Sequence, residues 1–182
     1  MENGFPVQFM DPSIILGQLG ISQGIEAADF GCASGYFTLP LAQLIGEKGM
    51  VHALDILPQA LETVESKVKM LGLSNVTIKR VNLEKIGGSK LSDASMDWVI
   101  AKDMLFQNQQ KEVILQEMHR VLRPTGKAFV AEWEKNSSTV GPDQSLRISK
   151  DELNNLLQEN KFKVEREVSV GNFHYAVVVS KI

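Results

Sequence analysis

The sequence predicts an α/β fold in which helices cover both faces of a mainly parallel sheet. Short apolar segments alternate with amphipathic ones along most of the chain, and only Gly171 and Asn172 separate the last two apolar segments. Strands that alternate with helices form parallel sheets through right-handed crossovers, whereas a two-residue connection joins antiparallel strands. We therefore expect a three-layer sandwich with a seven-stranded sheet whose last strand is antiparallel.

Seven apolar segments have the length and pattern of strands. They lie at residues 25–30, 50–54, 76–81, 98–101, 127–133, 162–170 and 173–179. The clearest helix begins at Pro58 and ends at Gly72, because apolar residues between them recur at spacings of three and four. Further helices are expected at residues 13–19, 37–44 and 109–122, and after Ser149, which forms a capping box with Glu152.

Size and charge favour a single domain spanning residues 1–182. Of the 182 residues, 43% are apolar and 23% charged, which is enough for one buried core. The net charge of −3 provides no broad basic surface, so nucleic acid is a disfavoured partner. No apolar run approaches the roughly 20 residues that span a bilayer, and the first residues lack the pattern of a signal peptide. We expect no membrane partner and a cytoplasmic location.

Cysteine and histidine usage agrees with that expectation. Cys32 is the only cysteine, so no intrachain disulfide can form and a reducing compartment fits best. The histidines His52, His119 and His174 are far apart in the sequence and pair with no cysteine at a ligand spacing. No metal site is therefore expected.

The loop after the first expected strand is the strongest functional signal. Residues 27–43 read AADFGCASGYFTLPLAQ: Asp29 closes an apolar run, and Gly31, Ala33 and Gly35 follow at alternate positions. Such small side chains let the backbone turn sharply and let a ligand approach the main-chain amides. We expect Ala33 to fit with a negative φ. The pattern predicts a nucleotide-type cofactor site, and the alternative is a tight strand-to-helix turn with no ligand.

The combination of this loop with the terminal hairpin resembles the class I S-adenosylmethionine-dependent methyltransferases, which have a Rossmann-like fold. The resemblance covers nearly the whole chain. Residues 101–134, with their RVLRPTG turn, are similar to the small-molecule enzymes of the ubiquinone and menaquinone C-methyltransferase group, also called type 11 methyltransferases. The resemblance implies S-adenosylmethionine as the cofactor and S-adenosylhomocysteine as its product.

The resemblance also assigns cofactor contacts. It implies that the loop holds the methionine part, that Asp55 accepts hydrogen bonds from the ribose hydroxyls, and that Ile56 lies against the adenine. It also implies that Asn82 and Leu83 contact the adenine edge. The alternative role for Asp55 is to cap a helix, and the alternative role for Asn82 is to form an ordinary turn. The cofactor-binding residues expected are Asp29, Gly31, Ala33, Gly35, Asp55, Ile56, Asn82 and Leu83, with Ala101 and Lys102 passing beside the cofactor through their backbones.

Acceptor residues are expected where strands end at the same edge of the sheet. Asp103 follows the fourth strand, Trp133 ends the fifth, and His174 begins the antiparallel last strand. We expect His174 or Asp103 to bind the acceptor or act as a base, and Trp133 and Phe106 to line its pocket. The alternatives are a solvent-facing histidine, a helix-capping aspartate and two aromatic side chains packed in the core.

Two segments are candidates for covering this site. The polar segment 134–148 is expected to form a lid, and the N-terminal segment 1–20, in particular residues 5–10, is a candidate for a second cover. A frayed tail is the alternative for the N-terminal segment.

The expected activity is in-line methyl transfer to a small-molecule acceptor without a covalent intermediate. Methylation of a protein or RNA and a non-catalytic cofactor-binding module remain alternatives. A nicotinamide-dependent oxidoreductase is disfavoured by the terminal hairpin, and arsenite methylation by the single cysteine, since arsenite-methylating relatives use several. The oligomeric state, monomer or homodimer, stays open.

Overall fold

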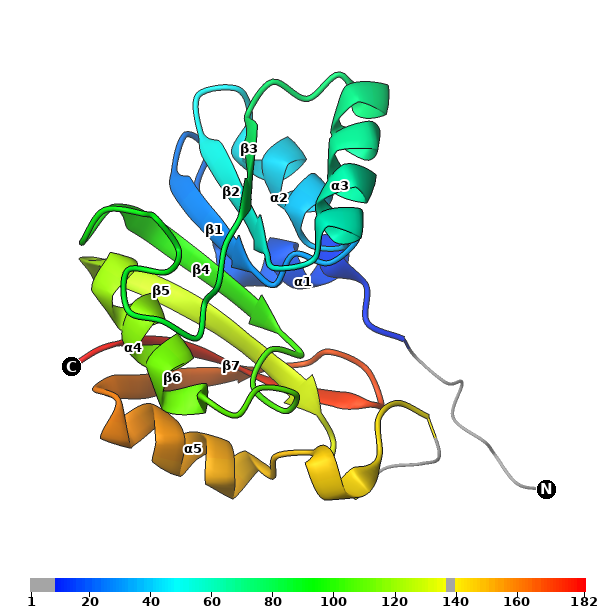
Figure 1. The fold of residues 1–182 in the computed structure, drawn as a ribbon. Helices are drawn as coiled ribbons and strands as arrows, with labels where there is room; N and C mark the ends of the chain where they lie inside the picture. Colours follow the sequence, from blue (N-terminus) through cyan, green and yellow to red (C-terminus); the bar gives the residue numbers. More distant parts are fainter. Residues whose placement is uncertain (1–8, 137–139) are drawn as a thin grey trace.

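The seven strands form one mixed sheet in the computed structural model, which describes residues 9–136 and 140–182 (Figure 1). The strand order is β3-β2-β1-β4-β5-β7-β6. The strands are β1 Glu26–Phe30, β2 Met50–Asp55, β3 Val76–Arg80, β4 Met96–Lys102, β5 Leu122–Trp133, β6 Phe162–Val168 and β7 His174–Lys181. β7 is antiparallel to both β5 and β6, whereas β1 to β5 pair in parallel. The predicted fold class is confirmed.

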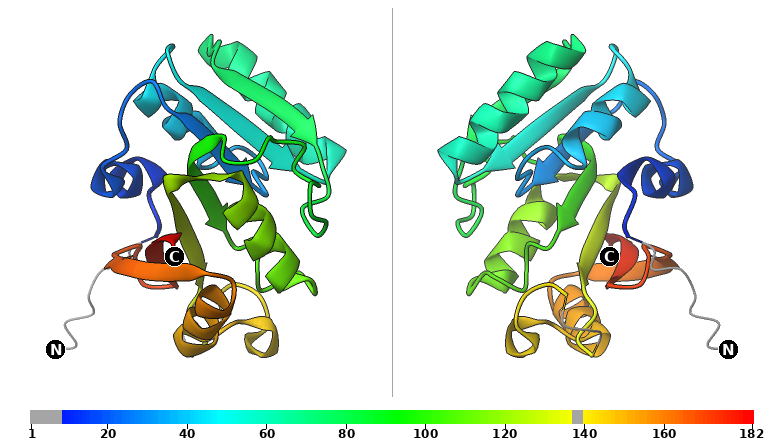
Figure 2. Two further views of the ribbon diagram at one scale, coloured as in Figure 1. Left: turned by 90° about the vertical axis from the view of Figure 1, so that its left-hand side faces the viewer. Right: turned by 90° about the vertical axis from the view of Figure 1, so that its right-hand side faces the viewer.

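Helices connect the strands and cover both faces of the sheet (Figure 2). They are α1 Pro12–Leu19, α2 Thr38–Ile45, α3 Pro58–Leu71, α4 Lys111–Val121 and α5 Lys150–Glu159, with a short 3₁₀ helix, η1, at Gln144–Leu146. α3 has the predicted bounds and ends at Gly72, whose φ of 64° suits a helix terminus. α5 begins with the predicted capping box between Ser149 and Glu152. Within the described residues, no helix is long and apolar enough to cross a membrane.

Alternate residues of each strand enter opposite layers of the core. Phe129 of β5 packs with apolar side chains of α1 and α2, whereas its neighbour Val130 packs with those of α4 and α5. The period-two pattern of a strand produces this alternation. Because both faces are buried, the central strands read as continuous apolar runs, which explains why the sequence revealed them.

Two predicted boundaries are wrong. β5 begins at Leu122, directly after α4, so Pro124 and Gly126 lie within the strand; the β4–β5 register shifts there, between Met96 and Trp98. The last connection is residues 169–173 and not a two-residue turn, because β6 ends at Val168 and β7 begins at His174. Both differences reflect pairing with a partner strand, which local sequence does not show.

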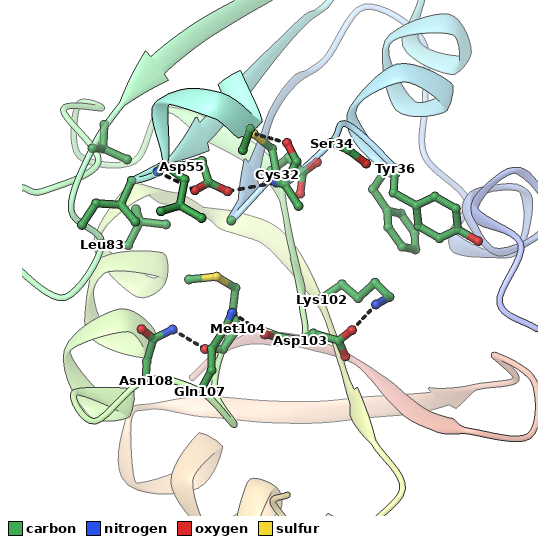
Figure 3. A pocket seen from close by; sticks show the side chains of 18 of the residues that line it. Cys32, Ser34, Tyr36, Asp55, Leu83, Lys102, Asp103, Met104, Gln107 and Asn108 are labelled. Carbon is green, nitrogen blue, oxygen red and sulfur yellow. Dashed lines mark hydrogen bonds and ion pairs between the residues drawn. The ribbon is translucent and has the colours of Figure 1, made fainter. Parts of the chain in front are cut away.

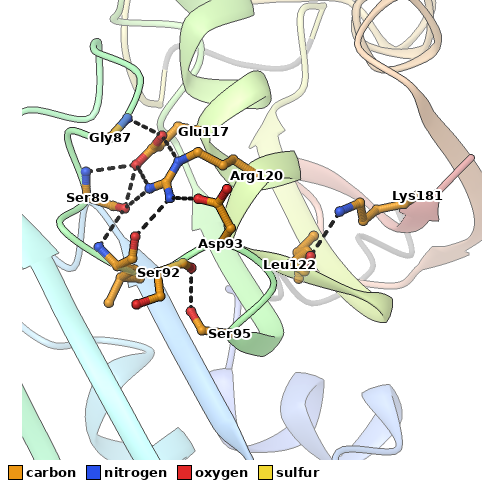
Figure 4. A network of polar contacts seen from close by, with 10 residues as sticks. Gly87, Ser89, Ser92, Asp93, Ser95, Glu117, Arg120, Leu122 and Lys181 are labelled. Atoms are coloured by element: carbon orange, nitrogen blue, oxygen red, sulfur yellow. Dashed lines mark hydrogen bonds and ion pairs between the residues drawn. The ribbon is translucent and has the colours of Figure 1, made fainter.

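An ion pair between the buried Glu117 and the partly buried Arg120 fixes the connection between β3 and β4 to α4 (Figure 4). The fully buried Glu117 accepts hydrogen bonds from the backbone N–H groups of Gly87, at 2.7 Å, and Ser89, at 2.9 Å. Arg120 donates to Glu117 at 2.7 Å and to the carbonyl oxygen of Leu91 at 2.9 Å. Burial alone would raise the pKa of Glu117, but hydrogen bonds from Arg120 and Ser89 lower it to about 2. The connection is therefore held by a charged side chain of α4.

Candidate cofactor and acceptor site

A cavity of about 780 Å³ lies at the carboxyl edge of the parallel strands (Figure 3). Its walls come from the segments that follow β1, β2, β3 and β4. The predicted site residues that line it are Asp29, Gly31, Ala33, Asp55, Ile56, Asn82, Leu83, Lys102 and Asp103. Segments far apart in the sequence thus meet in one cavity.

The small-residue loop after β1 turns through left-handed conformations. Gly31, Ala33 and Gly35 have φ values of 73°, 45° and 83°. A side chain at Gly31 would collide with Met104, and one at Gly35 would approach Leu39 and Val64 to 3.3 Å. The expectation of a negative φ at Ala33 is therefore wrong, because the turn has left-handed residues at alternate positions and Ala33 is one of them.

Asp55 joins this loop to the end of β2. Its Oδ2 accepts a hydrogen bond from the backbone N–H of Ala33, and its Oδ1 accepts one from Leu57, both at 2.9 Å. The residue at the N-cap of α3 is Leu57, so Asp55 does not cap that helix. Each carboxylate oxygen has a second lone pair for a further donor. Ile56 and Leu57 are 51% and 58% exposed and give the cavity an apolar wall beside the carboxylate.

Asn82 lines the cavity and also closes a local turn. Its Oδ1 accepts a hydrogen bond from the backbone N–H of Glu84 at 2.9 Å. This is the turn interaction that the sequence left open, but the oxygen retains a lone pair for a ligand donor. Leu83 lies beside it in the cavity wall.

Asp29 is buried beneath the loop. The hydroxyl of Thr38, at the start of α2, donates to its Oδ2 at 2.6 Å. Burial raises the pKa of Asp29 to about 6, the Thr38 hydrogen bond opposes this rise, and the negative charge of Asp55 adds to it. Asp29 is thus a carboxylate whose charge a cationic ligand group would stabilise.

The neighbouring Cys32 is not activated. Burial, followed by the negative charges of Asp29 and Asp55, raises the pKa of its thiol, which disfavours the nucleophilic thiolate. The described residues contain no group of three or more His, Cys, Asp or Glu side chains arranged to hold a metal ion.

Asp103 is the charged group at the opposite wall of the cavity. It has a left-handed φ of 56° and forms an ion pair with Lys102. Nε2 of His174 lies 3.1 Å from its Oδ1 and 3.4 Å from its Oδ2. The His174 side chain is only 8% exposed and does not line the cavity. The structure therefore brings the two predicted residues together, with Asp103 facing the cavity and His174 behind it.

Three other predicted residues lie behind the cavity wall and do not line it. Trp133 stacks on His174, with ring centroids 4.0 Å apart, and the Arg147 guanidinium lies 5.7 Å from the indole centroid. Phe106 packs against the core cluster of α4 and α5. Ala101 is fully buried near the carboxyl end of β4, between its neighbours in β1 and β5. Gly35, which packs closely against Leu39 and Val64, also does not line the cavity.

Sequence reasoning missed several lining residues, among them Tyr36, Gln107 and Asn108. Their residue types do not by themselves indicate a cofactor site.

The N-terminal segment contacts the cavity wall through Met10. The Tyr36 hydroxyl donates to the carbonyl oxygen of Met10, and the ring of Phe9 lies 5.3 Å from that of Phe173. The described end of the expected N-terminal cover thus borders the site, while residues 5–8 lie outside the described residues.

The strand order, the antiparallel β7 and the acidic small-residue loop after β1 define a Rossmann-like methyltransferase of class I, whose members use S-adenosylmethionine. The chain belongs to the methyltransferase-domain family, whose profile matches residues 21–172.

Solved and curated relatives agree with this assignment. A SAM-dependent methyltransferase from Aquifex aeolicus superposes with a TM-score of 0.88 and 26% identity, covering 96% of this chain and 91% of that one. The demethylmenaquinone methyltransferase of Geobacillus stearothermophilus is 31% identical over 112 residues, which are 62% of this chain and 47% of the relative. The arsenite methyltransferase of Aquipseudomonas alcaligenes is 26% identical over 113 residues, or 60% of this chain and 33% of the relative. The chain spans about half the length of the first of these curated relatives and less of the second.

The cavity fits the cofactor of this class. Its volume of about 780 Å³ lies within the roughly 300–1,000 Å³ of ligand pockets. The cavity offers a carboxylate for hydroxyl donors at Asp55, an ionisable carboxyl at Asp29 and an apolar wall at Ile56. These are the chemical groups that ribose, ammonium and adenine require.

Proposed function

We propose that the protein transfers a methyl group from S-adenosylmethionine to a nucleophilic atom of a small-molecule acceptor. The observation that carries this proposal is the cavity that has Asp29 and Asp55 in one wall and the ion-paired Asp103 in another. Demethylmenaquinone and arsenite, which the relatives' names indicate as acceptors, are both small molecules.

The proposed cofactor contacts follow the cavity wall. Asp29 and the Gly31–Ala33 backbone would hold the methionine part. Asp55 would accept hydrogen bonds from the ribose hydroxyls. The adenine would lie among Ile56, Asn82 and Leu83. Lys102 borders the cofactor from the end of β4. When bound, S-adenosylmethionine supplies a methyl group on a positively charged sulfur, so no residue has to form a covalent intermediate. Positioning alone can correspond to effective molarities of roughly 10⁵–10⁸ M.

Asp103 is the residue that we assign to the acceptor. Its carboxylate faces the cavity and can accept a proton or hydrogen bond from the acceptor. Lys102, which also lines the cavity, and His174, which does not, both contact this carboxylate and keep it oriented. His174 is thus a positioning residue in this proposal.

Arsenite is a poor candidate for the acceptor. An arsenic acceptor calls for thiolate ligands, and the only cysteine, Cys32, has a buried thiol with a raised pKa. A proton-bearing organic acceptor agrees better with a carboxylate at Asp103.

We also propose that residues 1–182 act as one cytoplasmic domain in which the segment 134–148 borders the acceptor. The shared sheet and the single cysteine support the first part. Arg147 supports the second, because its guanidinium donates to the carbonyl oxygens of Glu134, Val140 and Pro142, each at 2.8 Å. These bonds hold the described part of the segment beside Trp133.

Calorimetry against S-adenosylmethionine, S-adenosylhomocysteine and NAD tests the cofactor assignment. We expect both sulfur-containing ligands to bind and NAD to show no heat. Binding of NAD without either sulfur-containing ligand would overturn the proposal.

Transfer of a radiolabelled methyl group tests the acceptor class. Reduced naphthoquinones, arsenite, a peptide mixture and RNA would be assayed in parallel, and label is expected only in an organic small molecule. Asp103→Asn should abolish this incorporation while the affinity for S-adenosylhomocysteine stays within about threefold, because general-base steps contribute roughly 10²–10⁴. Label in RNA or peptide alone would refute the small-molecule assignment.

A further inference from the structure

Glu132 is a buried carboxyl group that the proposed mechanism does not use. It lies in β5, one residue before Trp133, and is fully buried. Its Oε1 accepts a hydrogen bond from the backbone N–H of Leu105 at 2.7 Å, and the backbone N–H of the next residue, Phe106, also acts to lower the pKa of the carboxyl group. Among the described residues, its Oε2 has no hydrogen-bond partner. Such burial costs free energy, so the group calls for an explanation.

The turn that Glu132 binds carries two residues of the cavity wall. Asp103 and Met104 both line the cavity, and they directly precede Leu105. The turn is strained, since Asp103 has a φ of 56° that L-residues rarely adopt. The backbone N–H of Asp103 donates to the carbonyl oxygen of Ala131 at 2.8 Å, so β5 anchors the turn at both ends.

We propose that Glu132 is a positioning residue of the site, whose buried carboxyl group holds the 103–106 turn so that Asp103 and Met104 face the cavity. The effect on the cofactor rests on the proposed methyltransferase function, whereas the effect on the turn does not. Strained conformations of this kind persist only where surrounding contacts impose them.

The surroundings of Glu132 keep it neutral. Burial raises its pKa to about 8 against the opposing hydrogen bond from Leu105, the charge of Asp103 adds to the rise, and that of Lys102 opposes it. From β7, Tyr175 adds no charge, because burial raises the pKa of its hydroxyl as well. Ionisation above about pH 8 would create a second negative charge next to Asp103. Water can stabilise that charge only if the turn opens.

The sign of the stability effect follows from this raised pKa. The pKa of Glu132 rises from 4.5 in the unfolded chain to about 8 in the folded protein. Its favourable contribution to the free energy of unfolding is therefore fully present below about pH 4.5 and is lost as the pH rises through about 8. Asp29 titrates in part of this window, but it is present in every variant and cancels in the comparison.

The test compares Glu132→Gln and Glu132→Met with the wild type and with Glu62→Gln, a control at an exposed site on α3. Amide exchange protection of Leu105 and Phe106, and calorimetric affinity for S-adenosylhomocysteine, are measured at about pH 6.5 and about pH 9. At the higher pH, amide protection and affinity for S-adenosylhomocysteine should each fall about tenfold in the wild type and in the control. The glutamine variant keeps an acceptor and cannot ionise, so both values should stay constant. The methionine variant should show weak protection and weak affinity at both pH values.

Opposite results overturn the proposal. If Glu132→Gln loses protection at high pH as the wild type does, or Glu132→Met keeps it, Glu132 does not hold the turn. If the methionine variant does not fold, urea unfolding of the glutamine variant tests the proposal instead. The urea midpoint of Glu132→Gln should rise relative to that of the wild type between about pH 4.5 and about pH 8. Failure of every protein, wild type included, to bind S-adenosylhomocysteine would refute the proposed function, and the amide exchange would still decide whether Glu132 holds the turn.

Discussion

Residues with left-handed backbone conformations surround the cavity, and two of them are not glycine. Gly31, Ala33 and Asp103 have φ values of 73°, 45° and 56°. An L-residue in this region costs roughly 1–2 kcal/mol, and less for aspartate, whose side chain bonds locally. The ligand-facing turns thus hold conformational strain that the surrounding sheet offsets.

Substitution of Ala33 tests this strain. Ala33→Val should lower the free energy of unfolding by about 1–3 kcal/mol, because a β-branched side chain fits a positive φ poorly. Ala33→Gly should change it by less than about 1 kcal/mol, since relief of strain is offset by the greater entropy of the unfolded chain. Urea unfolding of both variants measures the difference. Equal stability of the two variants would mean that Ala33 is not strained.

Asp55 permits a direct test of the proposed ribose contact. Its two oxygens accept backbone hydrogen bonds from Ala33 and Leu57, so the amide of Asp55→Asn must point its NH₂ group at one of these donors. Loss of charge and of one acceptor should weaken S-adenosylhomocysteine binding about 10- to 100-fold. Calorimetry compares this variant with Asp151→Asn, an exposed carboxylate on α5 that should bind as the wild type does. An unchanged affinity in Asp55→Asn would remove the ribose assignment.

The type and order of the secondary structure elements could be predicted from the sequence. Periodicity and capping signals are local, and α3 has its predicted bounds because Pro58 and Gly72 act within one helix. The start of β5 could not be predicted, because Pro124 and Gly126 are turn residues by type but lie in a strand with a shifted register. Pairing across the sheet decides such positions.

The contact between α4 and the β3–β4 connection carries its own prediction. Glu117→Gln should lower the free energy of unfolding by about 2–3 kcal/mol at neutral pH, because it removes the buried charge that accepts hydrogen bonds from Arg120 and Ser89, while Asp93 still pairs with Arg120. The pKa of Glu117 is lowered from 4.5 to about 2, so its contribution is present above about pH 4.5 and is lost as the pH falls through about 2. Chemical unfolding at several pH values should therefore show the variant and the wild type converging in acid. A constant difference down to pH 2 would contradict the ion-pair explanation.

At the scale of the whole molecule, the cofactor side of the site was easier to predict than the acceptor side. Asp29 and Asp55 lie at the carboxyl ends of β1 and β2, and Asn82 comes two residues after β3, so the parallel topology alone places them at one edge. For Trp133 and His174 the sequence predicted the correct edge, but which face of the sheet a side chain occupies, and what covers it, depends on packing. Tyr36 and Gln107 line the cavity through loop geometry that no residue type announces.

Ligand binding should stabilise the whole fold, because the cavity joins four strand ends. S-adenosylhomocysteine at about 100 times its dissociation constant should add about 2.7 kcal/mol, which for a chain of this size raises Tm by about 5–10 °C. Thermal unfolding with and without the ligand measures the shift. NAD at the same concentration is the control, and an equal shift with NAD would contradict the proposed cofactor.

The position of β7 has a consequence for folding. Among the described strands, β6 pairs only with β7, which follows it in the chain and pairs with β5 on its other side. During synthesis β6 therefore leaves the ribosome before its partner strand exists, and it cannot join the sheet until β7 inserts. β7 also supplies His174, so the support behind Asp103 is assembled in the same late event.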